Sequence, residues 1–259
     1  MQIAKVIDYI VNWLSEYCNN AGMRGFVIGV SGGIDSAVTS TLCAKTAKPV
    51  ILLNLPIYQA AEQLSLAEQH IKWLQQKYKQ VRVIKMNLTP VLRVLEKTFP
   101  TEIQEGLTMA NTRSRVRMLT LYAVSSHHKM LVVGTGNKVE DFGVGFFAKY
   151  GDGGVDISPI ADLLKSEVHA IGQELGIIKD ILDATPTDGL WLDNRTDESQ
   201  IGATYAELEW AMQFDSHPEN EAQLSTRQEE ILRIYRQFHN ANRHKMVPVP
   251  ICRIPDALK

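Results

Sequence analysis

Residues 26–36 of this chain read FVIGVSGGIDS, a short apolar run that ends in a glycine-rich turn. The run has the length and composition of a buried strand, and the residues after Gly33 resemble a helix start. At such a junction, backbone N–H groups and the positive end of the helix dipole face one point, which favours an anion. Glycines also let the backbone approach a phosphate closely. We therefore expect a phosphate-binding loop between this strand and its helix.

The loop carries Asp35 and lacks the lysine of the GxxxxGK[ST] pattern, so it is not a Walker P-loop. A carboxylate beside phosphates repels them unless a hard divalent cation lies between the two. The loop therefore predicts Mg²⁺ as a cofactor alongside a nucleotide. An ordinary glycine turn is the alternative, but the SGGIDS spacing rarely arises by chance between a strand and a helix.

Apolar runs alternate with helical periods along the chain, which predicts right-handed βαβ crossovers and an α/β fold. We expect a doubly wound parallel sheet with helices on both faces, and ligands beyond the carboxyl ends of the strands. The strand candidates are 26–30, 50–55, 81–86 and 130–135, with a weaker one at 155–160. The helix candidates are 2–20, 35–47, 60–79, 89–98 and 108–127, followed by further helices to about residue 240.

The composition is that of an ordinary globular protein, with 259 residues, 45% hydrophobic residues and a net charge of −2. No basic excess indicates nucleic acid as a partner. Cys18, Cys43 and Cys252 are scattered, which favours reduced thiols in the cytoplasm. The N-terminal stretch is amphipathic rather than a signal peptide, and no run approaches the ~20 apolar residues of a membrane span. We expect a cytoplasmic protein that binds no membrane.

A second group of polar residues follows the fourth strand candidate, in residues 134–168. Thr135 offers a hydroxyl and Glu140 a second carboxylate; Lys149 precedes GDGG, and Lys165 opens the next helix. A lone lysine usually belongs to a solvated face. Carboxylates at two separate strand ends, with lysines around them, are what a Mg²⁺–triphosphate site requires.

Five stretches in this order, SGGIDS, GTGNKVED, FFAKYGDGGVDISPIADL, PTDGLW and RHK, resemble the NAD synthetases. These enzymes form one family of the N-type ATP pyrophosphatases, and other members of that group share only the first stretch. The resemblance runs from about residue 20 to residue 246. It implies the adenine nucleotide alpha-hydrolase-like fold. It also implies ATP-dependent amidation of deamido-NAD⁺ with ammonia, through an acyl-adenylate, with release of AMP and pyrophosphate.

The resemblance further implies a role for each matching residue. The ATP contacts would be Gly29, Val30, Ser31, Gly32, Gly33, Ile34, Asp35, Ser36, Thr135, Lys165 and Thr187. The deamido-NAD⁺ contacts would be Arg115, Lys149, Asp156, His244 and Lys245. Asp35 and Glu140 would bind Mg²⁺. Asp35 and Lys165 would be catalytic, and Asp156 is our candidate for accepting the proton of ammonia.

The chain departs from the family pattern at two places. Gly136 and Asn137 stand where the family often has Asp-His in GTDHAAE, and one extra residue precedes FFAKYGDGG. Asn54 stands where many ammonia-dependent members have an arginine, which leaves the adenine-side contact open. Both features resemble the synthetase domain of the larger glutamine-dependent enzymes. Only a short stretch precedes residue 26, so we expect no glutaminase domain, and ammonia from solution or from a separate amidase.

We expect one domain over residues 1–259, with an N-terminal helix at about 2–20, a nucleotide-binding core at about 24–183, and a lid with C-terminal helices at about 184–259. The polar segment 185–202 is the predicted lid. Family resemblance implies a homodimer.

The rival functions are a tRNA-thiolating or GMP-synthetase-like adenylating enzyme and a non-catalytic nucleotide sensor. Thiolation would require a reactive cysteine pair, and a sensor would not require both Asp35 and Glu140.

Overall fold

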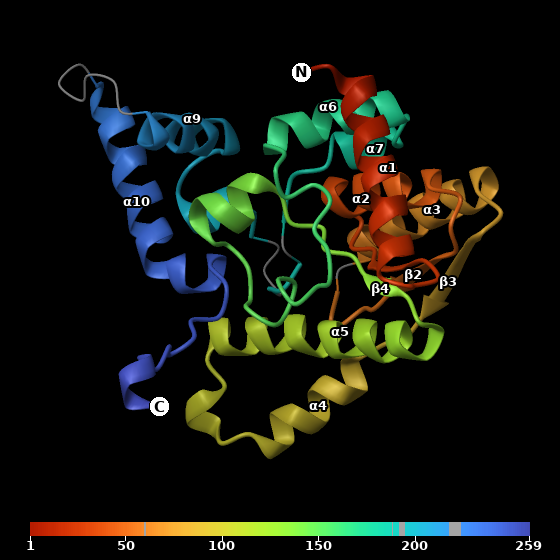
Figure 1. Cartoon of the computed structure of the whole chain (residues 1–259), viewed down its shortest axis with the longest axis horizontal. Helices are drawn as coiled ribbons and strands as arrows, with labels where there is room; N and C mark the ends of the chain where they lie inside the picture. Colours follow the sequence, from red (N-terminus) through yellow and green to blue (C-terminus); the bar gives the residue numbers. More distant parts are fainter. Residues whose placement is uncertain (60, 188, 192–194, 218–223) are drawn as a thin grey trace.

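The computed structural model describes residues 1–59, 61–187, 189–191, 195–217 and 224–259. These residues form an α/β fold around a parallel four-stranded sheet in the order β3-β2-β1-β4 (Figure 1). The predicted fold class is confirmed. The strands are β1 (Phe26–Gly29), β2 (Val50–Asn54), β3 (Val81–Lys85) and β4 (Leu131–Val132).

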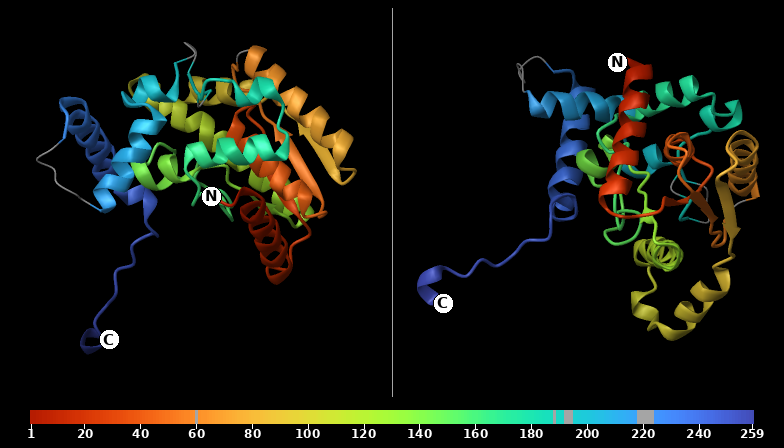
Figure 2. Two further views of the ribbon diagram at one scale, coloured as in Figure 1. Left: turned by 90° about the horizontal axis from the view of Figure 1, so that it is seen from above. Right: turned by 45° about the vertical axis from the view of Figure 1, so that its right-hand side comes forward.

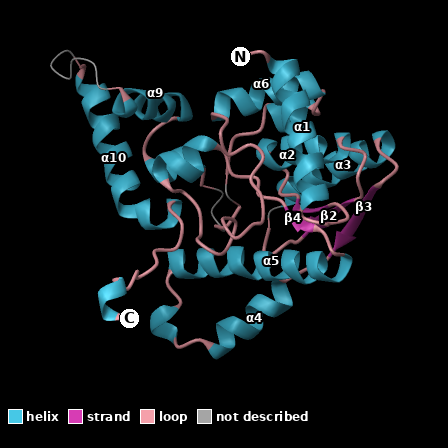
Figure 3. Cartoon of the chain, viewed as in Figure 1, coloured by secondary structure: helices cyan, strands magenta, loops and turns pink. Residues whose placement is uncertain are grey.

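Helices cover both faces of the sheet because successive strand residues are apolar and point to opposite sides (Figure 3). Ile28 and Leu52 pack with one set of helices, while Val27 and Ile51 pack with the other. The first set is α1 (Ile3–Asn20), α2 (Ile34–Lys45), α3 (Ala61–Lys77), α6 (Lys165–Leu175) and α7 (Lys179–Leu182). The second set is α4 (Thr89–Thr98) and α5 (Gly106–His128), with a short η1 (Thr101–Ile103) between them.

A further helical layer stands beside the sheet and has its own apolar core. Its elements are the π-helix η2 (Val139–Val144), α8 (Asp197–Ile201), α9 (Tyr205–Ser216) and α10 (Thr226–Met246). After Met246 the chain runs away from the body as an exposed arm that ends in η4 (Asp256–Leu258) (Figure 2). None of the described helices combines the length and apolar character that crossing a bilayer requires.

The strand order places a switch point between β1 and β4, because β1 pairs with β2 on one side and with β4 on the other. The turn into α2 leaves the carboxyl end of β1, and the turn toward η2 leaves the carboxyl end of β4. Ligands of open parallel sheets bind at such a point. The sheet therefore brings the two polar segments noted in the sequence to one edge.

Two details of the sequence prediction are wrong. Residues 155–160 form no strand, and only a single bridge joins Ile157 to Val133. The Asp156 carboxylate accepts the Val132 N–H at 2.8 Å, which removes a donor that a strand there would use. The segment 185–202, predicted as a loop, contains α8, whose first turn is capped by the Thr196 hydroxyl.

Candidate active site

The turn between β1 and α2 has the shape of an anion-binding loop. Gly32 has a φ of +92°, a conformation that favours glycine, and Gly33 is the N-cap of α2. The hydroxyls of Ser31 and Ser36 lie 3.1 Å apart, and Ser36 also donates to the Gly33 carbonyl at 2.9 Å. These bonds hold the turn closed, with the α2 N-terminus facing the sheet edge.

Three charged side chains from three distant elements meet beside this loop. The Lys165 ammonium lies 2.5 Å from an oxygen of Asp35 and 3.0 Å from an oxygen of Glu140. All three are largely buried, with side-chain exposures of 10%, 16% and 17% respectively. Because Lys165 opens α6 while Asp35 opens α2, the packing of these two helices fixes the contact.

Burial and mutual charge shift the pKa of each group in this cluster. Burial raises the pKa of Asp35, opposed by the nearby Lys165 ammonium and reinforced by the Glu140 carboxylate. Burial also acts to raise the pKa of Glu140, but Lys165 and the Tyr205 hydroxyl outweigh it and lower this pKa. Burial disfavours the charge of Lys165, yet the two carboxylates together raise its pKa. The cluster holds one cation between two acids, so each buried charge has an opposite charge in contact with it.

Residues that sequence reasoning missed complete this cluster. Asn137 donates to Asp35 at 3.2 Å, and its side-chain oxygen accepts the Glu140 N–H at 3.1 Å. The Tyr205 hydroxyl lies 2.6 Å from Glu140 and 3.2 Å from Asp197. Asn137 was noted only as a departure from the family pattern. Tyr205 and Asp197 carried no local signal, because both enter the site from the separate helical layer.

The remaining predicted ATP residues lie around the loop with fewer contacts. Thr135 follows β4 and is half-buried at the sheet edge. The Thr187 hydroxyl donates to the Arg195 carbonyl at 3.0 Å, so it braces its own segment. That segment also contacts α5, where Arg113 donates to the Leu190 carbonyl at 2.5 Å. Four residues of the predicted lid, 188 and 192–194, lie outside the described residues.

The predicted deamido-NAD⁺ residues gather where α10 meets the loop that follows η2. The Lys149 ammonium donates to the His244 carbonyl at 2.7 Å, and Arg115 donates to the Lys149 carbonyl at 3.4 Å. Lys245 donates to the carbonyls of Gly145 and Phe147. These cations bond to neutral carbonyls rather than to carboxylates, so their charge remains available to an anionic ligand.

Asp156 is placed differently from the other predicted residues. Its carboxylate accepts the Tyr122 hydroxyl at 2.9 Å and the Val132 N–H at 2.8 Å. No contact joins it to Lys165 within the described part of the chain. Its role as proton acceptor for ammonia stays a prediction.

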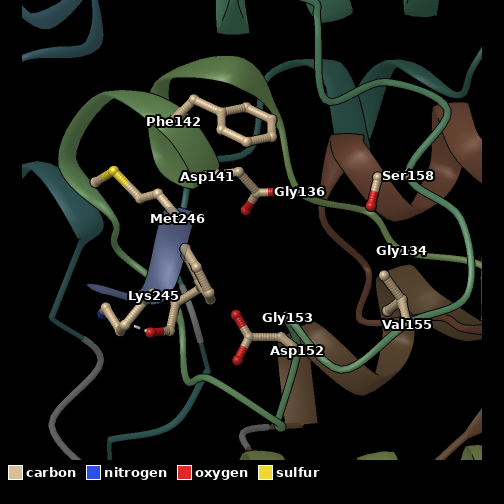
Figure 4. Close-up of a pocket in the computed structure, with 11 residues that line it drawn as sticks. Gly134, Gly136, Asp141, Phe142, Asp152, Gly153, Val155, Ser158, Lys245 and Met246 are labelled. Carbon is tan, nitrogen blue, oxygen red and sulfur yellow. Dashed lines mark hydrogen bonds between the residues drawn. The ribbon is translucent and has the colours of Figure 1, made fainter. Parts of the chain in front are cut away.

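A pocket of about 170 Å³ opens between the β4 turn, η2 and α10 (Figure 4). Its polar wall includes Asp141, Asp152, Ser158 and Lys245. Burial and the neighbouring carboxylates, chiefly Glu140, raise the pKa of Asp141 to about 8. Sequence reasoning assigned no role to Asp141.

The carboxylates of this cluster suit a divalent cation that also binds substrate oxygens. Among the described residues, no three His, Cys, Asp or Glu side chains form a complete ligand set. Asp35 and Glu140 nevertheless converge on one ammonium, so two carboxylates reach one cation-sized position. Mg²⁺ is commonly held by one or two carboxylates together with substrate phosphates and water. The residues present fit that mode of binding.

Comparisons with known proteins agree on one family. A family model described as NAD synthase matches residues 6–248. The NH(3)-dependent NAD(+) synthetase of Alkaliphilus oremlandii is 35% identical, over 97% of this chain and 98% of its own. The NH(3)-dependent NAD(+) synthetase of Mannheimia succiniciproducens is 33% identical, over 99% of this chain and 98% of that protein's length.

The solved structures are similar over the same length. The NMN synthetase from Francisella tularensis superimposes with a TM-score of 0.85 and 32% identity, over 99% of both chains. The NH3-dependent NAD synthetase from Campylobacter jejuni has a TM-score of 0.80 over 98% of this chain and all of its own. Its 23% identity supports the fold alone.

Proposed function

Since this chain belongs to the NAD synthase family, we propose that it amidates the nicotinate carboxylate of deamido-NAD⁺, using ammonia and ATP. The enzyme is a ligase that forms a C–N bond. The observation that carries the proposal is the Lys165 ammonium held between Asp35 and Glu140 beside an anion-binding turn. A site of this kind suits a triphosphate that must lose pyrophosphate.

In the first step the nicotinate carboxylate attacks the α-phosphorus of ATP, and the bond to the bridging oxygen breaks. Pyrophosphate leaves and an acyl-adenylate remains. The carboxylate and the triphosphate repel each other, so positioning and charge neutralisation dominate this step. The N–H groups of the loop, from Ser31 to Ser36, would hold the phosphates, and Lys165 would neutralise the charge that develops.

In the second step ammonia attacks the carbonyl carbon of the acyl-adenylate, AMP leaves, and one proton leaves the nitrogen. The product is the carboxamide of NAD⁺. Water that reached the adenylate would hydrolyse it. We propose that the segment 185–202 closes over the site as a lid, with Trp191 as its apolar anchor. Its contact with α5 supports this, because the Trp191 ring packs against Gly106 at the start of that helix.

We propose Mg²⁺ as the cofactor, held by Asp35 and Glu140 together with phosphate oxygens. When bound, the cation would neutralise the departing pyrophosphate. Asn137 would orient both ligands, because its amide contacts the Asp35 side chain and the Glu140 backbone. The fit rests on two carboxylates that already share one cation.

The substrate end would bind the dinucleotide through Arg115, Lys149, His244 and Lys245. Deamido-NAD⁺ carries a pyrophosphate and a carboxylate, which arginine and lysine donors suit. We propose a homodimer in the cytoplasm, on family resemblance and on scattered free cysteines. The exposed position of Arg115 and His244 is compatible with a substrate site that a second subunit completes.

A second candidate substrate is the corresponding deamidated mononucleotide. It is favoured by one observation, the similarity of this chain to the NMN synthetase from Francisella tularensis over nearly their whole lengths. The chemistry at the carboxylate would be the same, and only the adenylate half of the substrate would be missing. The phosphate loop does not distinguish the two substrates, since it serves ATP in both reactions.

Isotope exchange between ATP and pyrophosphate tests these proposals. We expect exchange that depends on Mg²⁺ and on deamido-NAD⁺, and NAD⁺ formation with ammonia but not with glutamine. Replacing the dinucleotide with the mononucleotide compares the two substrates through their kcat/KM values. A protein without exchange under any of these conditions would be a nucleotide sensor, and the proposal would be wrong.

A further inference from the structure

Tyr205 reaches the phosphate end from a helix that carries none of the predicted substrate residues. It is the first residue of α9, it is 7% exposed, and its hydroxyl lies 2.6 Å from an oxygen of Glu140. The face of its ring lies against Lys165, whose ammonium is 4.7 Å from the ring centroid. One side chain therefore contacts both a proposed metal ligand and the cation beside it.

The Tyr205 hydroxyl is the hydrogen-bond donor in its contact with Glu140. Burial, followed by the charges of Glu140 and Asp197, raises the pKa of Tyr205, so the phenol keeps its proton. The hydroxyl also lies 3.2 Å from Asp197, but one proton serves one acceptor at a time. The shorter contact is the one with Glu140, and it assigns the proton to that carboxylate.

Contacts on both sides of Tyr205 hold it in place. Its own N–H donates to the Glu198 carboxylate at 2.9 Å, and the preceding residue caps α9. One turn later, Glu209 accepts the N–H of Ser166 at 2.8 Å and its hydroxyl at 2.7 Å, at the start of α6. Residues four apart share one face of a helix, so this face of α9 meets both α6 and η2. The hydroxyl is thus presented by a helix that is anchored to the helix bearing Lys165.

We propose that Tyr205 is a positioning residue, which holds the Glu140 carboxylate in the orientation that binds the divalent cation. This inference rests on the proposed function. A glutamate side chain has several rotatable bonds, and two donors, Lys165 and Tyr205, meet at the same Glu140 oxygen, Oε1. Lys165 is also a proposed phosphate contact, so ATP would draw its ammonium away, whereas Tyr205 has no such second role. Hydrogen bonds to ligating carboxylates orient them and strengthen metal binding.

The first test is the Tyr205→Phe variant, which keeps the ring against Lys165 and removes the hydroxyl. Titration calorimetry would measure its affinity for a non-hydrolysable ATP analogue twice, once as the Mg²⁺ complex and once in EDTA. We expect the affinity for the Mg²⁺ complex to fall about 10-fold, as for loss of a hydrogen bond to a ligating carboxylate. The affinity for the metal-free analogue should stay within about twofold, because the phosphate loop is unchanged.

Tyr235→Phe is the matched control. Tyr235 is 4% exposed and belongs to the same helical layer, where its ring stacks on His239. Within the described residues, no hydrogen bond joins its hydroxyl to the charged cluster. Both affinities should therefore stay at the wild-type values. A purely structural role of Tyr205 would instead lower both affinities together, along with the free energy of unfolding in urea.

The second test asks whether Tyr205 acts through Glu140. The same two affinities would be measured for Glu140→Gln and for the double variant Glu140→Gln/Tyr205→Phe. In the Glu140→Gln background, Tyr205→Phe should weaken binding of the Mg²⁺ complex by no more than about twofold, because the carboxylate that it positions is gone. Losses that add in full would mean that the hydroxyl acts independently of Glu140.

Three results would overturn the inference. The first is an unchanged affinity of Tyr205→Phe for the Mg²⁺ complex, the second is an equal loss for the Mg²⁺ complex and the metal-free analogue, and the third is full additivity in the double variant. If the wild-type protein itself binds the two forms of the analogue equally well, the proposed metal site fails instead, so the two failures are distinguishable.

Discussion

The two ends of the candidate site are built in opposite ways. At the phosphate end, Lys165 is buried between two carboxylates, and the turn before α2 is held by serine hydroxyls. At the substrate end, Arg115 and His244 are exposed, and the lysines donate to backbone carbonyls. At the phosphate end one buried ammonium thus faces two carboxylates, whereas positive charge is left over at the substrate end.

This difference separates a prebuilt region from one that its ligand must complete. A paired, buried cluster is costly to disturb, since removing one partner leaves an uncompensated charge. Cationic side chains that donate to backbone carbonyls can be replaced with little effect on the stability of the free protein. Their charge contributes when an anionic ligand binds. Substitutions at the phosphate end should therefore affect chemistry, and those at the substrate end should affect affinity.

The largest effect is expected for Asp35→Asn and Glu140→Gln. Each variant removes one charge of the proposed metal site, and ATP–pyrophosphate exchange should fall by about 10³-fold or more. The fold should persist, as judged by circular dichroism. Glu174→Gln, on the exposed side of α6, is the control and should exchange normally. Turnover equal to that of the wild-type protein, by either variant at the same Mg²⁺ concentration, would contradict the metal-site proposal.

A smaller effect is expected at the other end for Arg115→Ala. Loss of one charge-assisted contact should weaken deamido-NAD⁺ binding by about 2–3 kcal/mol, while ATP binding changes little. Titration calorimetry with each ligand measures the two affinities. Arg82→Ala, at an exposed position of β3, is the control. Equal losses for both ligands would mean that Arg115 has a structural role and that the two ends are not separable in this way.

A pH effect is expected from His70 of α3, which contacts Ser40 of α2, the helix that follows the phosphate loop. Burial lowers its pKa to about 4, and its Nε2 atom lies 2.9 Å from the Ser40 hydroxyl. Below about pH 6.5 the unfolded chain binds a proton at His70 that the folded chain does not bind. The free energy of unfolding therefore decreases as the pH is lowered from about 6.5 to about 4.

The contribution of His70 should amount to about 1 kcal/mol of lost stability at pH 5.5 relative to neutral pH. Urea unfolding of the wild-type protein and of His70→Gln across this range isolates the histidine from the carboxylates. Parallel curves for the two proteins would show that His70 is not buried as a neutral group. In that case the phosphate end would be less rigid than its contacts indicate.

The smallest effect concerns the segment 185–202, which joins the two ends. We expect its amide hydrogen exchange to slow when an ATP analogue and deamido-NAD⁺ are both present, because the segment is polar and ligands would supply the contacts it lacks. Thr187 would then turn from its bond with Arg195 toward the nucleotide. Exchange that saturating ligands leave unchanged would contradict the lid and indicate a static loop.

Local patterns were sufficient to predict the phosphate end. The alternation of strands and helices predicts the sheet, and the spacing SGGIDS predicts a turn at the carboxyl end of β1. Asp35 belongs to that turn, so its place required no tertiary information. Glu140 and Lys165 were singled out as an acid and a cation near a second strand end, and resemblance to a family gave them their roles; the structure brings both to Asp35.

The rest could not be predicted, because it depends on contacts across the chain. Tyr205 reaches Glu140 from α9, and nothing in the local sequence of that helix indicates the contact. Asp141 lies on the π-helix η2 and lines the pocket, and the periodicity of the sequence does not reveal a π-helix. The strand expected at 155–160 failed for a similar reason, since the Asp156 side chain takes a backbone donor of β4.

The serine bonds of the phosphate loop have a consequence for the kinetics of nucleotide capture. Ser31 and Ser36 hold the turn in shape through bonds of their own hydroxyls. An arriving phosphate exchanges one hydrogen-bond partner for another, and no stretch of backbone has to become ordered. ATP should therefore associate at a rate set by diffusion and by the local electric field, which makes capture sensitive to ionic strength and insensitive to the slower motions of the chain.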